Sequence, residues 1–467
     1  PRPGNNLYSM NKHYHFIGIG GIGMSGIAHL FLCRGYGASG SDVKDSAILS
    51  QLKELGAQIY IGHRSENIKN ADVVVYSSAI SNDNPEIIEA IKKGIPIIKR
   101  AQALAELMVN KDVVAIAGSH GKTTTTSLAS CLLLEAGLSP TAVIGGILKN
   151  IGMNACSGQG DFFVAEADES DGSFLYYQPK YSIITNIDRE HLDYYNNFDN
   201  EIEAFRQFVA KTKNNGCVFA CADDLNLRNI LERYGGRKIF FGLNSNADVY
   251  AKNVKLNGLT SEFDCFSKNK FVDRFYLSLG GEHNISNSLA VIALGLELGI
   301  SLDIIKKALK NFKGAKRRLE IKFSDDDYLF IDDYAHHPSE IKATLSAAAN
   351  LARKRVVAIF QPHRYSRTKL LLDDFSKSFA QADCVIITDI YPASELPIPG
   401  IDGKLLYNKI KDQDPGKEVY FLARQEIQDF VARNMRSGDL VLTLGAGDIV
   451  KIGEELVAKF TRQSLVR

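Results

Sequence analysis

Several features that define special classes of protein are missing from this sequence. No apolar run approaches the roughly 20 residues that a membrane-spanning helix needs, and Pro1–Met10 lack the apolar core of a signal peptide. Lys and Arg number 55 against 54 Asp and Glu, so almost no net charge remains. This balance argues against a nucleic-acid or membrane-surface binder. We therefore expect a cytoplasmic protein that acts on small molecules, as a monomer or a homodimer.

Cysteine is sparse as well. Seven cysteines are scattered over 467 residues, and the one close pair, Cys217 and Cys221, is not a C-x-x-C motif. The pattern favours reduced, buried thiols in the cytosol over a disulfide framework. What remains is an ordinary globular composition, 45% hydrophobic and 23% charged, in a chain long enough for about three domains.

The most informative stretch reads VVAIAGSHGKTTTT and begins at residue 113. Val113–Ala117 are apolar and predict a buried strand, Gly118–Gly121 predict a turn, and Thr124–Glu135 predict a helix. A strand, a glycine turn and Lys-Thr at the start of a helix are typical of a phosphate cradle.

The chemistry of this stretch suits a nucleoside triphosphate. Glycine lets the backbone approach the phosphates, and the N–H groups at the helix start face their negative charge. Lys122 is expected at the β- and γ-phosphates and Thr123 at Mg²⁺. Ile116 stands where the usual P-loop has its first glycine, so the motif is the shortened G-x-x-G-K-T. The alternative is a tight turn with a surface lysine.

A second glycine motif lies near the N-terminus. Gly18, Gly20 and Gly23 match G-x-G-x-x-G after a short strand, and Asp42 follows at the end of a second expected strand. The fingerprint predicts a nucleotide diphosphate at the helix start, with Asp42 near a ribose or sugar. The alternative is a glycine-rich turn that permits tight helix–sheet packing.

The end of a further strand supports a ligand site in this region. Ser77 and Ser78 follow the expected strand at residues 72–76, and ligands of open α/β sheets gather at the carboxyl ends of the strands. We expect a small doubly wound domain over residues 1–108.

Acidic residues follow the next strand of the central region. The expected strand Phe162–Ala165 leads into Glu166, and an acid at such a strand end near a P-loop is the usual second ligand of Mg²⁺. Three neighbouring acids could instead belong to a solvated loop: Asp161, Asp168 and Glu169.

A histidine follows the third strand of the same expected sheet. The strand Tyr181–Thr185 runs into NIDREHLD, which contains His191. A neutral imidazole there could bind a second metal ion. A hydrogen-bonded structural role is the alternative.

Two asparagines open a helix further along the chain. Asn284 and Asn287, in GGEHNISN, are spaced i and i+3 and so share one face of the first helical turn. An asparagine amide can pair with the N6/N7 edge of adenine, although asparagine is also a common helix cap. The basic segment GAKRRLE that follows at residues 314–320 predicts a hinge, from which an arginine could reach a γ-phosphate.

The last third is again α/β and carries polar clusters at two strand ends. DDYAHHPSE begins at Asp332, and QPHRYSRT begins at Gln361. The second cluster gathers His363, Arg364 and Arg367, a ready site for a carboxylate.

These motifs together resemble the Mur ligases of bacterial cell-wall synthesis. The stretches that carry the resemblance occur in the family's order and cover nearly the whole chain: HFIGIGGIGMSGIA, GSHGKTTT, AEADESDGSFL, HLD, GEHNISN, GAKRRLE, DDYAHHPSE and QPHRYSRT. The resemblance implies an α/β fold of three domains. Residues 1–108 would form a Rossmann-like sheet for a UDP-sugar, residues 109–318 a P-loop ATPase domain, and residues 319–467 a Rossmann-like domain for the amino acid.

The resemblance also implies an activity. It implies ATP-dependent ligation of L-alanine to UDP-N-acetylmuramic acid through an acyl phosphate, with ATP and two Mg²⁺ ions. The nearest alternative is a recycling ligase that adds a whole peptide to the same sugar nucleotide. An NAD-dependent dehydrogenase, suggested by G-x-G-x-x-G alone, and a regulatory nucleotide-binding module without chemistry are weaker alternatives, because they leave the P-loop acids or the His-Arg cluster unexplained.

Residue roles follow from the likeness, position by position. The sugar nucleotide is assigned to Gly18, Gly20, Gly23, Met24, Ser25, Asp42, Ser77 and Ser78. ATP is assigned to Gly118, Ser119, His120, Gly121, Lys122, Thr123, Thr124, Asn284, Asn287, Arg318 and Asp333. Metal is assigned to Thr123, Glu166 and His191, and the amino acid to Tyr334, His336, Arg364 and Arg367. Catalysis is assigned to Lys122, Glu166, His191, Arg318, Asp333 and His337, with His337 or Asp333 as acceptor of the amine proton.

Two departures from the family pattern stand out. Leu319 stands where the family often has an aromatic residue after the arginine pair. The segment after His191 offers no candidate for the carbamylated lysine that relatives adding later residues often have near the second metal, which also fits the member that adds L-alanine.

Overall fold

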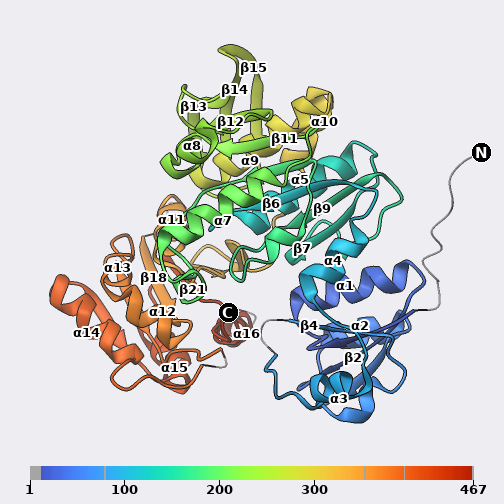
Figure 1. The fold of residues 1–467 in the computed structure, drawn as a ribbon. Coiled ribbons are helices and arrows are strands. Elements are labelled where there is room, and N and C mark those ends of the chain that lie inside the picture. Colours follow the sequence, from blue (N-terminus) through green and yellow to red (C-terminus); the bar gives the residue numbers. More distant parts are fainter. Residues whose placement is uncertain (1–11, 78–79, 352–353, 394, 465–467) are drawn as a thin grey trace, which may run out of the picture. The chain divides into compact units, whose positions relative to one another are not determined.

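The computed structural model describes residues 12–77, 80–351, 354–393 and 395–464. Within them lie three β-sheets, each flanked by helices (Figure 1). This confirms the predicted three-domain α/β fold. Contacts between segments divide the chain into two compact units: residues 1–252, 264–273 and 286–313 form the first, and residues 253–263, 274–285 and 314–467 form the second. The predicted boundaries at residues 108 and 318 stay a prediction.

The N-terminal sheet is parallel, with strand order β3-β2-β1-β4-β5. Its strands are β1 (His13–Ile17), β2 (Gly37–Asp42), β3 (Gln58–Ile61), β4 (Val73–Tyr76) and β5 (Ile97–Lys99). Its helices are α1 (Ile22–Cys33), α2 (Ala47–Glu54), α3 (Pro85–Lys93) and α4 (Arg100–Leu107), with the short 3-10 helix η1 (Ser65–Ile68). Helix α1 contacts both α2 and α4, and α3 contacts η1. The strand order reverses between β1 and β4, where such sheets bind ligands.

Glu86, at the start of α3, is fully buried under this sheet. Its carboxylate accepts hydrogen bonds from Ser41 Oγ at 2.6 Å and Asn67 Nδ2 at 2.5 Å. His15 Nε2 and His63 Nδ1 lie 3.5 and 3.6 Å from the same carboxylate. Burial alone would raise the pKa of Glu86, but the adjacent His15 and the hydrogen bonds from Ser41 and Asn67 lower it below its usual value. The carboxylate is therefore held ionised inside the domain.

We expect Glu86→Gln to lower the free energy of unfolding at neutral pH by about 1–3 kcal/mol, because the variant leaves buried donors poorly matched. A depressed carboxyl pKa stabilises the fold above the unfolded-state value and loses that contribution as the pH falls through the folded-state value. The difference between variant and wild type should therefore shrink below about pH 4.5. Urea unfolding of the variant and the wild type, at neutral pH and below about pH 4.5, measures this difference in the free energy of unfolding. Glu89→Gln, a change at a partly exposed ion-paired position of the same helix, is the control, and an equal loss in both variants would contradict the assignment.

The central sheet has ten strands in the order β15-β14-β13-β12-β11-β10-β6-β9-β7-β8. The strands around β6 (Asp112–Ala117) are β10 (Tyr181–Ile184), β11 (Cys217–Cys221), β12 (Lys238–Gly242), β9 (Phe162–Glu166), β7 (Thr141–Leu148) and β8 (Met153–Cys156). Strand β6 lies parallel to both β9 and β10, so the ends of these three strands meet at one edge. The helices of this region are α5 (Lys122–Glu135), α6 (Leu192–Tyr195), α7 (Phe198–Ala210), α8 (Leu225–Glu232), α9 (Glu282–Glu297) and α10 (Leu302–Lys310), with the 3-10 helix η2 (Ser173–Tyr176).

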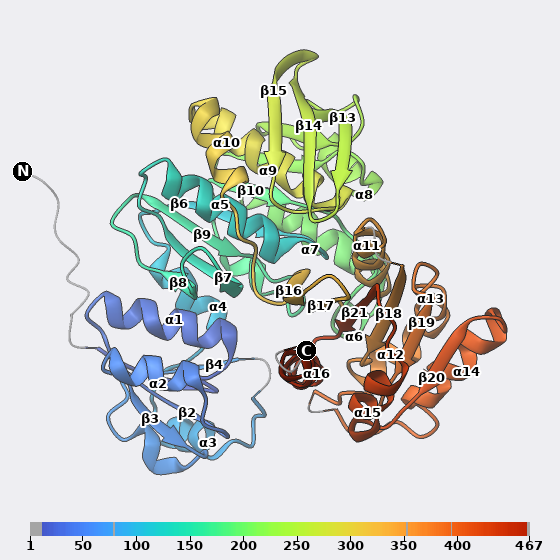
Figure 2. The ribbon, with the colours of Figure 1, turned by 180° about the vertical axis from the view of Figure 1, so that it is seen from behind.

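Three long strands at one end of this sheet were not among the predicted elements. They are β13 (Val249–Asn257), β14 (Thr260–Ser267) and β15 (Lys270–Leu277), and Figure 2 shows them side by side. In β13 the first three residues, Val249–Ala251, are buried and the next four are exposed, so this strand lacks the apolar/polar alternation that marks a half-buried strand.

The C-terminal sheet has the order β16-β17-β21-β18-β19-β20, with only β16 antiparallel to its neighbour among the described pairings. Its strands are β16 (Glu320–Ser324), β17 (Tyr328–Asp333), β18 (Arg355–Phe360), β19 (Cys384–Ile387), β20 (Glu418–Phe421) and β21 (Asp439–Leu444). Its helices are α11 (Pro338–Ala349), α12 (Tyr365–Leu370), α13 (Leu372–Ser376), α14 (Gly403–Gln413), α15 (Arg424–Asn434) and α16 (Val450–Ser464).

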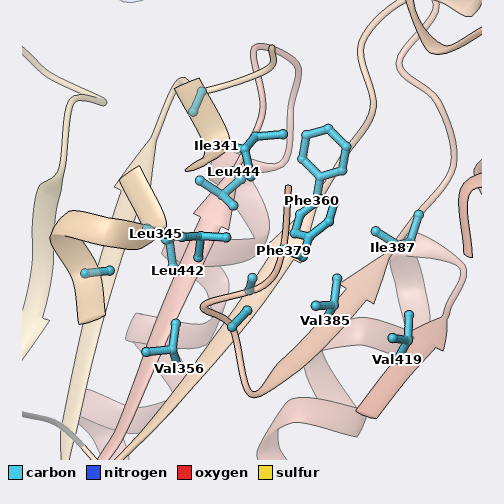
Figure 3. Close-up of a cluster of buried hydrophobic side chains, with 14 of the residues drawn as sticks. Ile341, Leu345, Val356, Phe360, Phe379, Val385, Ile387, Val419, Leu442 and Leu444 are labelled. Carbon is cyan, nitrogen blue, oxygen red and sulfur yellow. The ribbon is translucent and has the colours of Figure 1, made fainter. Parts of the chain in front are cut away.

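One face of this sheet carries a continuous apolar core. Figure 3 shows Phe360 and Leu444 from neighbouring strands packed with Phe379, and all three are at most 1% exposed. The core fixes β17, β18 and β21 side by side, and hence the polar segments that follow β17 and β18. Between β18 and β19 the chain forms two short helices, α12 and α13, with a break at Leu371, where the backbone leaves helical geometry.

All seven cysteines are free, and five of them are buried. Cys33 is exposed, so the prediction of buried thiols is wrong for this residue. Across the part of the chain that the structure describes, we find no helix with both the length and the apolar character needed to span a bilayer.

Candidate active site

The turn after β6 has the shape of the predicted phosphate cradle. Gly118 and Gly121 have φ angles of +127° and +83°, which favour glycine. A Cβ on Gly118 would lie 2.2 Å from Thr185 Oγ1, and a Cβ on Gly121 would lie 2.6 Å from Asn287 Oδ1. The two glycines therefore serve both the backbone conformation and the close packing of the turn. Helix α5 begins at Lys122, two residues earlier than predicted, so Lys122 and Thr123 lie in its first turn.

A residue that the sequence analysis missed holds this turn in place. Asn186, just after β10, accepts a hydrogen bond from His120 N at 2.8 Å and donates one to His120 O at 3.1 Å. Its carbonyl oxygen also accepts from Ser119 N at 3.1 Å. The only sequence signal was its place at the end of a strand next to β6. The turn is thus fixed before any phosphate arrives.

Lys122 is the cation at the centre of the turn. Its Nζ donates to the carbonyl oxygens of Gly118 at 2.6 Å and Ser119 at 3.2 Å, and lies 2.7 Å from Glu169 Oε1. Burial would lower the pKa of Lys122, but the facing acids Glu169 and Asp168 raise it above its usual value. The lysine is therefore charged and aimed into the loop.

The acids after β9 divide into two places. Glu166 ends β9, as predicted, and accepts a hydrogen bond from Gly145 N on β7 at 2.7 Å. Glu169 lies under Lys122 and is fully buried, so it does not belong to a solvated loop. Its Oε2 is buried without a hydrogen-bond partner among the described residues. Local sequence did not distinguish Glu169 from its neighbouring acids.

His191 completes an acidic cluster at the same edge of the sheet. Its Nε2 lies 3.6 Å from Glu169 Oε1 and 3.4 Å from Glu190 Oε2. Burial would lower the pKa of His191, but the two carboxylates raise it to about 9. One ligand atom from each of the three side chains lies within 4.8 Å of the others, a spacing that could hold a metal ion. Two carboxylates and an imidazole, with one carboxylate oxygen buried and unpaired, fit a divalent cation.

The two asparagines of α9 differ in their surroundings. Asn287 lies against Gly121 of the turn, as the position of its amide oxygen shows. Asn284 lies in the first turn of α9, where its Nδ2 donates to Gly280 O at 2.8 Å, so it does not cap the helix. It belongs to the other compact unit.

The glycine motif near the N-terminus forms the turn between β1 and α1. Gly18 has a φ of +76°, and Asp42 Oδ2 accepts a hydrogen bond from Gly20 N at 2.9 Å. Met24 and Ser25 are each 2% exposed, and the backbone N–H of Ser25 already donates to Gly21 O at 2.8 Å. Ser77 follows β4, whereas Ser78 lies outside the described residues.

In the second unit, Asp333 ends β17 and is deeply buried. Its carboxylate accepts hydrogen bonds from Leu319 N at 2.6 Å and Ala335 N at 2.8 Å, and burial raises its pKa to about 6. Arg318 lies with its guanidinium 5.4 Å from the centre of the Tyr334 ring. The structure thus brings Arg318, Asp333 and Tyr334 together.

Arg317, which the sequence analysis did not assign, fixes the start of this unit. Its guanidinium pairs with buried Asp332 at 2.9 Å and donates to the carbonyl oxygens of Gly445 at 2.5 Å and Gly447 at 3.3 Å. The turn after β21 is therefore tied to the segment before β16.

The two polar clusters predicted at strand ends meet. The His336 and His363 rings lie 5.6 Å apart, and His363 stacks on Tyr391. Burial, followed by the nearby His336, Arg367 and Arg364, lowers the pKa of His363 to about 3, so its ring is neutral. His337 caps α11 through Nδ1, which accepts from Ser339 N at 3.4 Å. Two arginines beside neutral aromatic rings make a site suited to a carboxylate.

Three family models match the chain in succession. The model described as "Mur ligase family, catalytic domain" matches residues 13–112, "Mur ligase middle domain" matches residues 116–295, and "Mur ligase, glutamate ligase domain" matches residues 317–447. Together they span most of the described chain.

Individual proteins are similar over almost the whole length. UDP-N-acetylmuramate–L-alanine ligase of Desulfatibacillum aliphaticivorans is 48% identical, over 97% of this chain and 99% of the relative. The protein of the same name from Geobacter sp. (strain M21) is 45% identical, over 97% and 98%. The crystal structure of UDP-N-acetylmuramate-alanine ligase from Thermotoga maritima is similar with a TM-score of 0.83 at 30% identity, over 97% of this chain and 99% of that one. A murein peptide ligase from Psychrobacter arcticus has the same fold, with a TM-score of 0.72 at 24% identity, over 96% and 98%.

Proposed function

Because this chain belongs to the Mur ligase family, we propose that it joins L-alanine to the lactyl carboxylate of UDP-N-acetylmuramic acid with ATP. The observation that carries the substrates is the likeness, at 45% to 48% identity over nearly the full length, to relatives named UDP-N-acetylmuramate–L-alanine ligase. The products are UDP-N-acetylmuramoyl-L-alanine, ADP and phosphate. The reaction is a step of peptidoglycan precursor synthesis, which uses soluble substrates and fits a place in the cytoplasm.

The chemistry explains why a phosphate cradle is needed. A carboxylate does not accept an amine at neutral pH, because its oxygen is a poor leaving group. In the first step a lactyl carboxylate oxygen bonds to the γ-phosphorus of ATP, and the bond from that phosphorus to the bridging oxygen breaks. ADP leaves, and the carboxylate becomes an acyl phosphate. Two anions approach each other in this step, so positioning and charge neutralisation dominate catalysis.

The residues around the turn divide these tasks. The N–H groups of the turn and of the first turn of α5 receive the phosphate oxygens. Lys122 neutralises charge on the β- and γ-phosphates, and Arg318 is assigned to the nucleotide as well. Thr123, Glu166 and His191 would hold Mg²⁺, with Glu169 and Glu190 beside His191. Bound Mg²⁺ would spread the negative charge of the phosphoryl group and align it. Two ions are proposed, one at Thr123 and Glu166 and one at His191.

The second step makes the amide. The neutral amine of L-alanine attacks the acyl carbon, the carbon–oxygen bond to phosphate breaks, and the amine loses one proton. Asp333 or His337 accepts that proton in this proposal, and Tyr334, His336, Arg364 and Arg367 bind the amino acid. The proposed domain limits are residues 1–108, 109–318 and 319–467, for sugar nucleotide, ATP and amino acid.

A substrate panel tests the proposed function. Purified protein is supplied with ATP, Mg²⁺ and UDP-N-acetylmuramic acid, together with L-alanine, glycine, L-serine or the cell-wall tripeptide. We expect L-alanine to give the highest kcat/KM for amide formation, measured by mass spectrometry of the product. Preference for the tripeptide would instead establish the peptide-recycling alternative. Phosphate release that needs no amino acid would contradict both.

The metal assignment predicts a further effect. Glu166→Gln should raise the Mg²⁺ concentration for half-maximal ligation by about tenfold or more, because a charged oxygen ligand is lost while the shape is kept. A Mg²⁺ titration of initial rates measures the shift. Asp161→Asn, an exposed acid at the start of the same segment, is the control and should leave the titration unchanged. An identical titration for Glu166→Gln and wild type would remove Glu166 from the metal site.

A further inference from the structure

Arg100 is a cation between the two nucleotide-binding motifs, and neither the sequence analysis nor the similarity to relatives assigned it a role. It is the first residue of α4. A Cβ built on Gly23 would lie 2.2 Å from Arg100 Nη1. Gly23 is the third glycine of G-x-G-x-x-G and lies in the first turn of α1. The guanidinium therefore lies directly on the turn that the motif forms.

The other side of the guanidinium faces the acids after β9. Arg100 Nη2 lies 3.2 Å from Asp168 Oδ2. The side chains of Arg100 and Asp168 remain 31% and 35% exposed. The acid fixes the direction of the guanidinium without enclosing it.

The first turn of α1 has the backbone chemistry of an anion site. The N–H groups at residues 22–24 point out of the helix start and lack acceptors within the helix. No carboxylate side chain lies in this turn, whose sequence begins IGMS. A guanidinium beside such N–H groups provides the planar, two-point donor that phosphate oxygens favour. An arginine is thus placed where the proposed function requires the diphosphate of its sugar nucleotide.

We propose that Arg100 binds the diphosphate of the sugar nucleotide at the start of α1 and that Asp168 positions its guanidinium for this contact. The inference rests on the proposed function, because that function supplies the ligand. A purely structural ion pair does not need Arg100 to lie against Gly23, nor to keep a third of its side chain exposed. Asp168 also faces Lys122, so one acid serves the cations of both nucleotide sites.

Equilibrium binding without ATP tests the proposal. The probes are UDP-N-acetylmuramic acid, UDP and uridine, measured by calorimetry or competition on the full-length protein. Arg100→Gln should weaken UDP and UDP-N-acetylmuramic acid by about ten- to a hundredfold, the usual effect of losing a hydrogen-bonded charge. The affinity for uridine should not change. Lys99→Gln removes the neighbouring exposed cation and should alter none of the three.

Each other outcome is decisive. Weakening of UDP-N-acetylmuramic acid alone would assign Arg100 to the lactyl carboxylate and overturn the proposal. Equal weakening of all three probes, or none, would leave Arg100 a structural residue. Arg100→Lys keeps the charge but not the two-point geometry, and it should bind UDP several-fold more weakly than wild type even if Arg100→Gln does not fold. Failure of wild type to bind UDP-N-acetylmuramic acid would refute the proposed function instead.

Discussion

Lys122→Ala is expected to lower kcat/KM for ATP-dependent ligation by a factor of at least about 10²–10³, the effect of removing one charge-stabilising donor from a phosphoryl-transfer site. The reason is local. Lys122 is the cation that the turn itself provides, and its Nζ already lies within hydrogen-bond distance of two loop carbonyls and Glu169. Initial rates of phosphate release measure the change. Lys211→Ala, an exposed lysine that follows α7, is the control.

Loss of folding must be separated from loss of chemistry in this variant. Removing Lys122 leaves the fully buried Glu169 without its nearest cation, which destabilises a fold by about 3–5 kcal/mol in comparable buried pairs. The double variant Lys122→Ala/Glu169→Gln should therefore regain stability in urea unfolding but remain inactive. Recovery of ligation in the double variant would show that the lysine only balances Glu169 and does not act on phosphate.

Gly118→Ala is expected to cost about 3 kcal/mol or more of folding free energy and to abolish ATP binding. Its φ of +127° disfavours any side chain, and the new Cβ would lie 2.2 Å from Thr185 Oγ1 and 2.9 Å from the backbone oxygen of Asn186. The contact with backbone cannot relax by a rotamer change. The segment that would have to move is the one that holds the turn through Asn186 and His120.

Gly137→Ala is the matched control for this prediction. Gly137 also has a positive φ, +71°, but a Cβ there meets nothing within 4 Å. Gly137→Ala should lower the free energy of unfolding by only about 1–2 kcal/mol, because of the left-handed conformation, and should leave nucleotide binding intact. Thermal unfolding and ATP binding of both variants measure the difference. Equal losses of folding free energy in the two variants would mean that the packing around Gly118 is looser than described.

The sequence predicted what is encoded locally. Glycines that need a positive φ, such as Gly118 and Gly121, and acids or histidines at strand ends, such as Glu166 and His191, were recognised because each signal occupies a few adjacent residues. The parallel arrangement of β6, β9 and β10 then brings those strand ends to one edge of a sheet.

Pairings between distant segments could not be predicted. The partner of Lys122 is Glu169, which lies 47 residues away in the sequence. Nothing in the local sequence of residues 167–171, ADESD, distinguishes Glu169 from Asp168, and only the fold fully buries Glu169. Asn186 and Arg100 act on turns that lie 66 and 77 residues from them in sequence, as the numbering of His120 and Gly23 shows. Strand β13 was missed because its buried residues are grouped at one end and do not alternate with exposed ones.

The central claim is that ATP at the turn of residues 118–123 activates a carboxylate by phosphorylation. Its most direct test uses UDP-N-acetylmuramic acid with a heavy oxygen isotope in the lactyl carboxylate, together with ATP, Mg²⁺ and L-alanine. Mass spectrometry of the released phosphate should find one labelled oxygen atom for each amide formed, because the acyl phosphate hands its bridging oxygen to phosphate. Unlabelled phosphate accompanying amide formation would contradict the account.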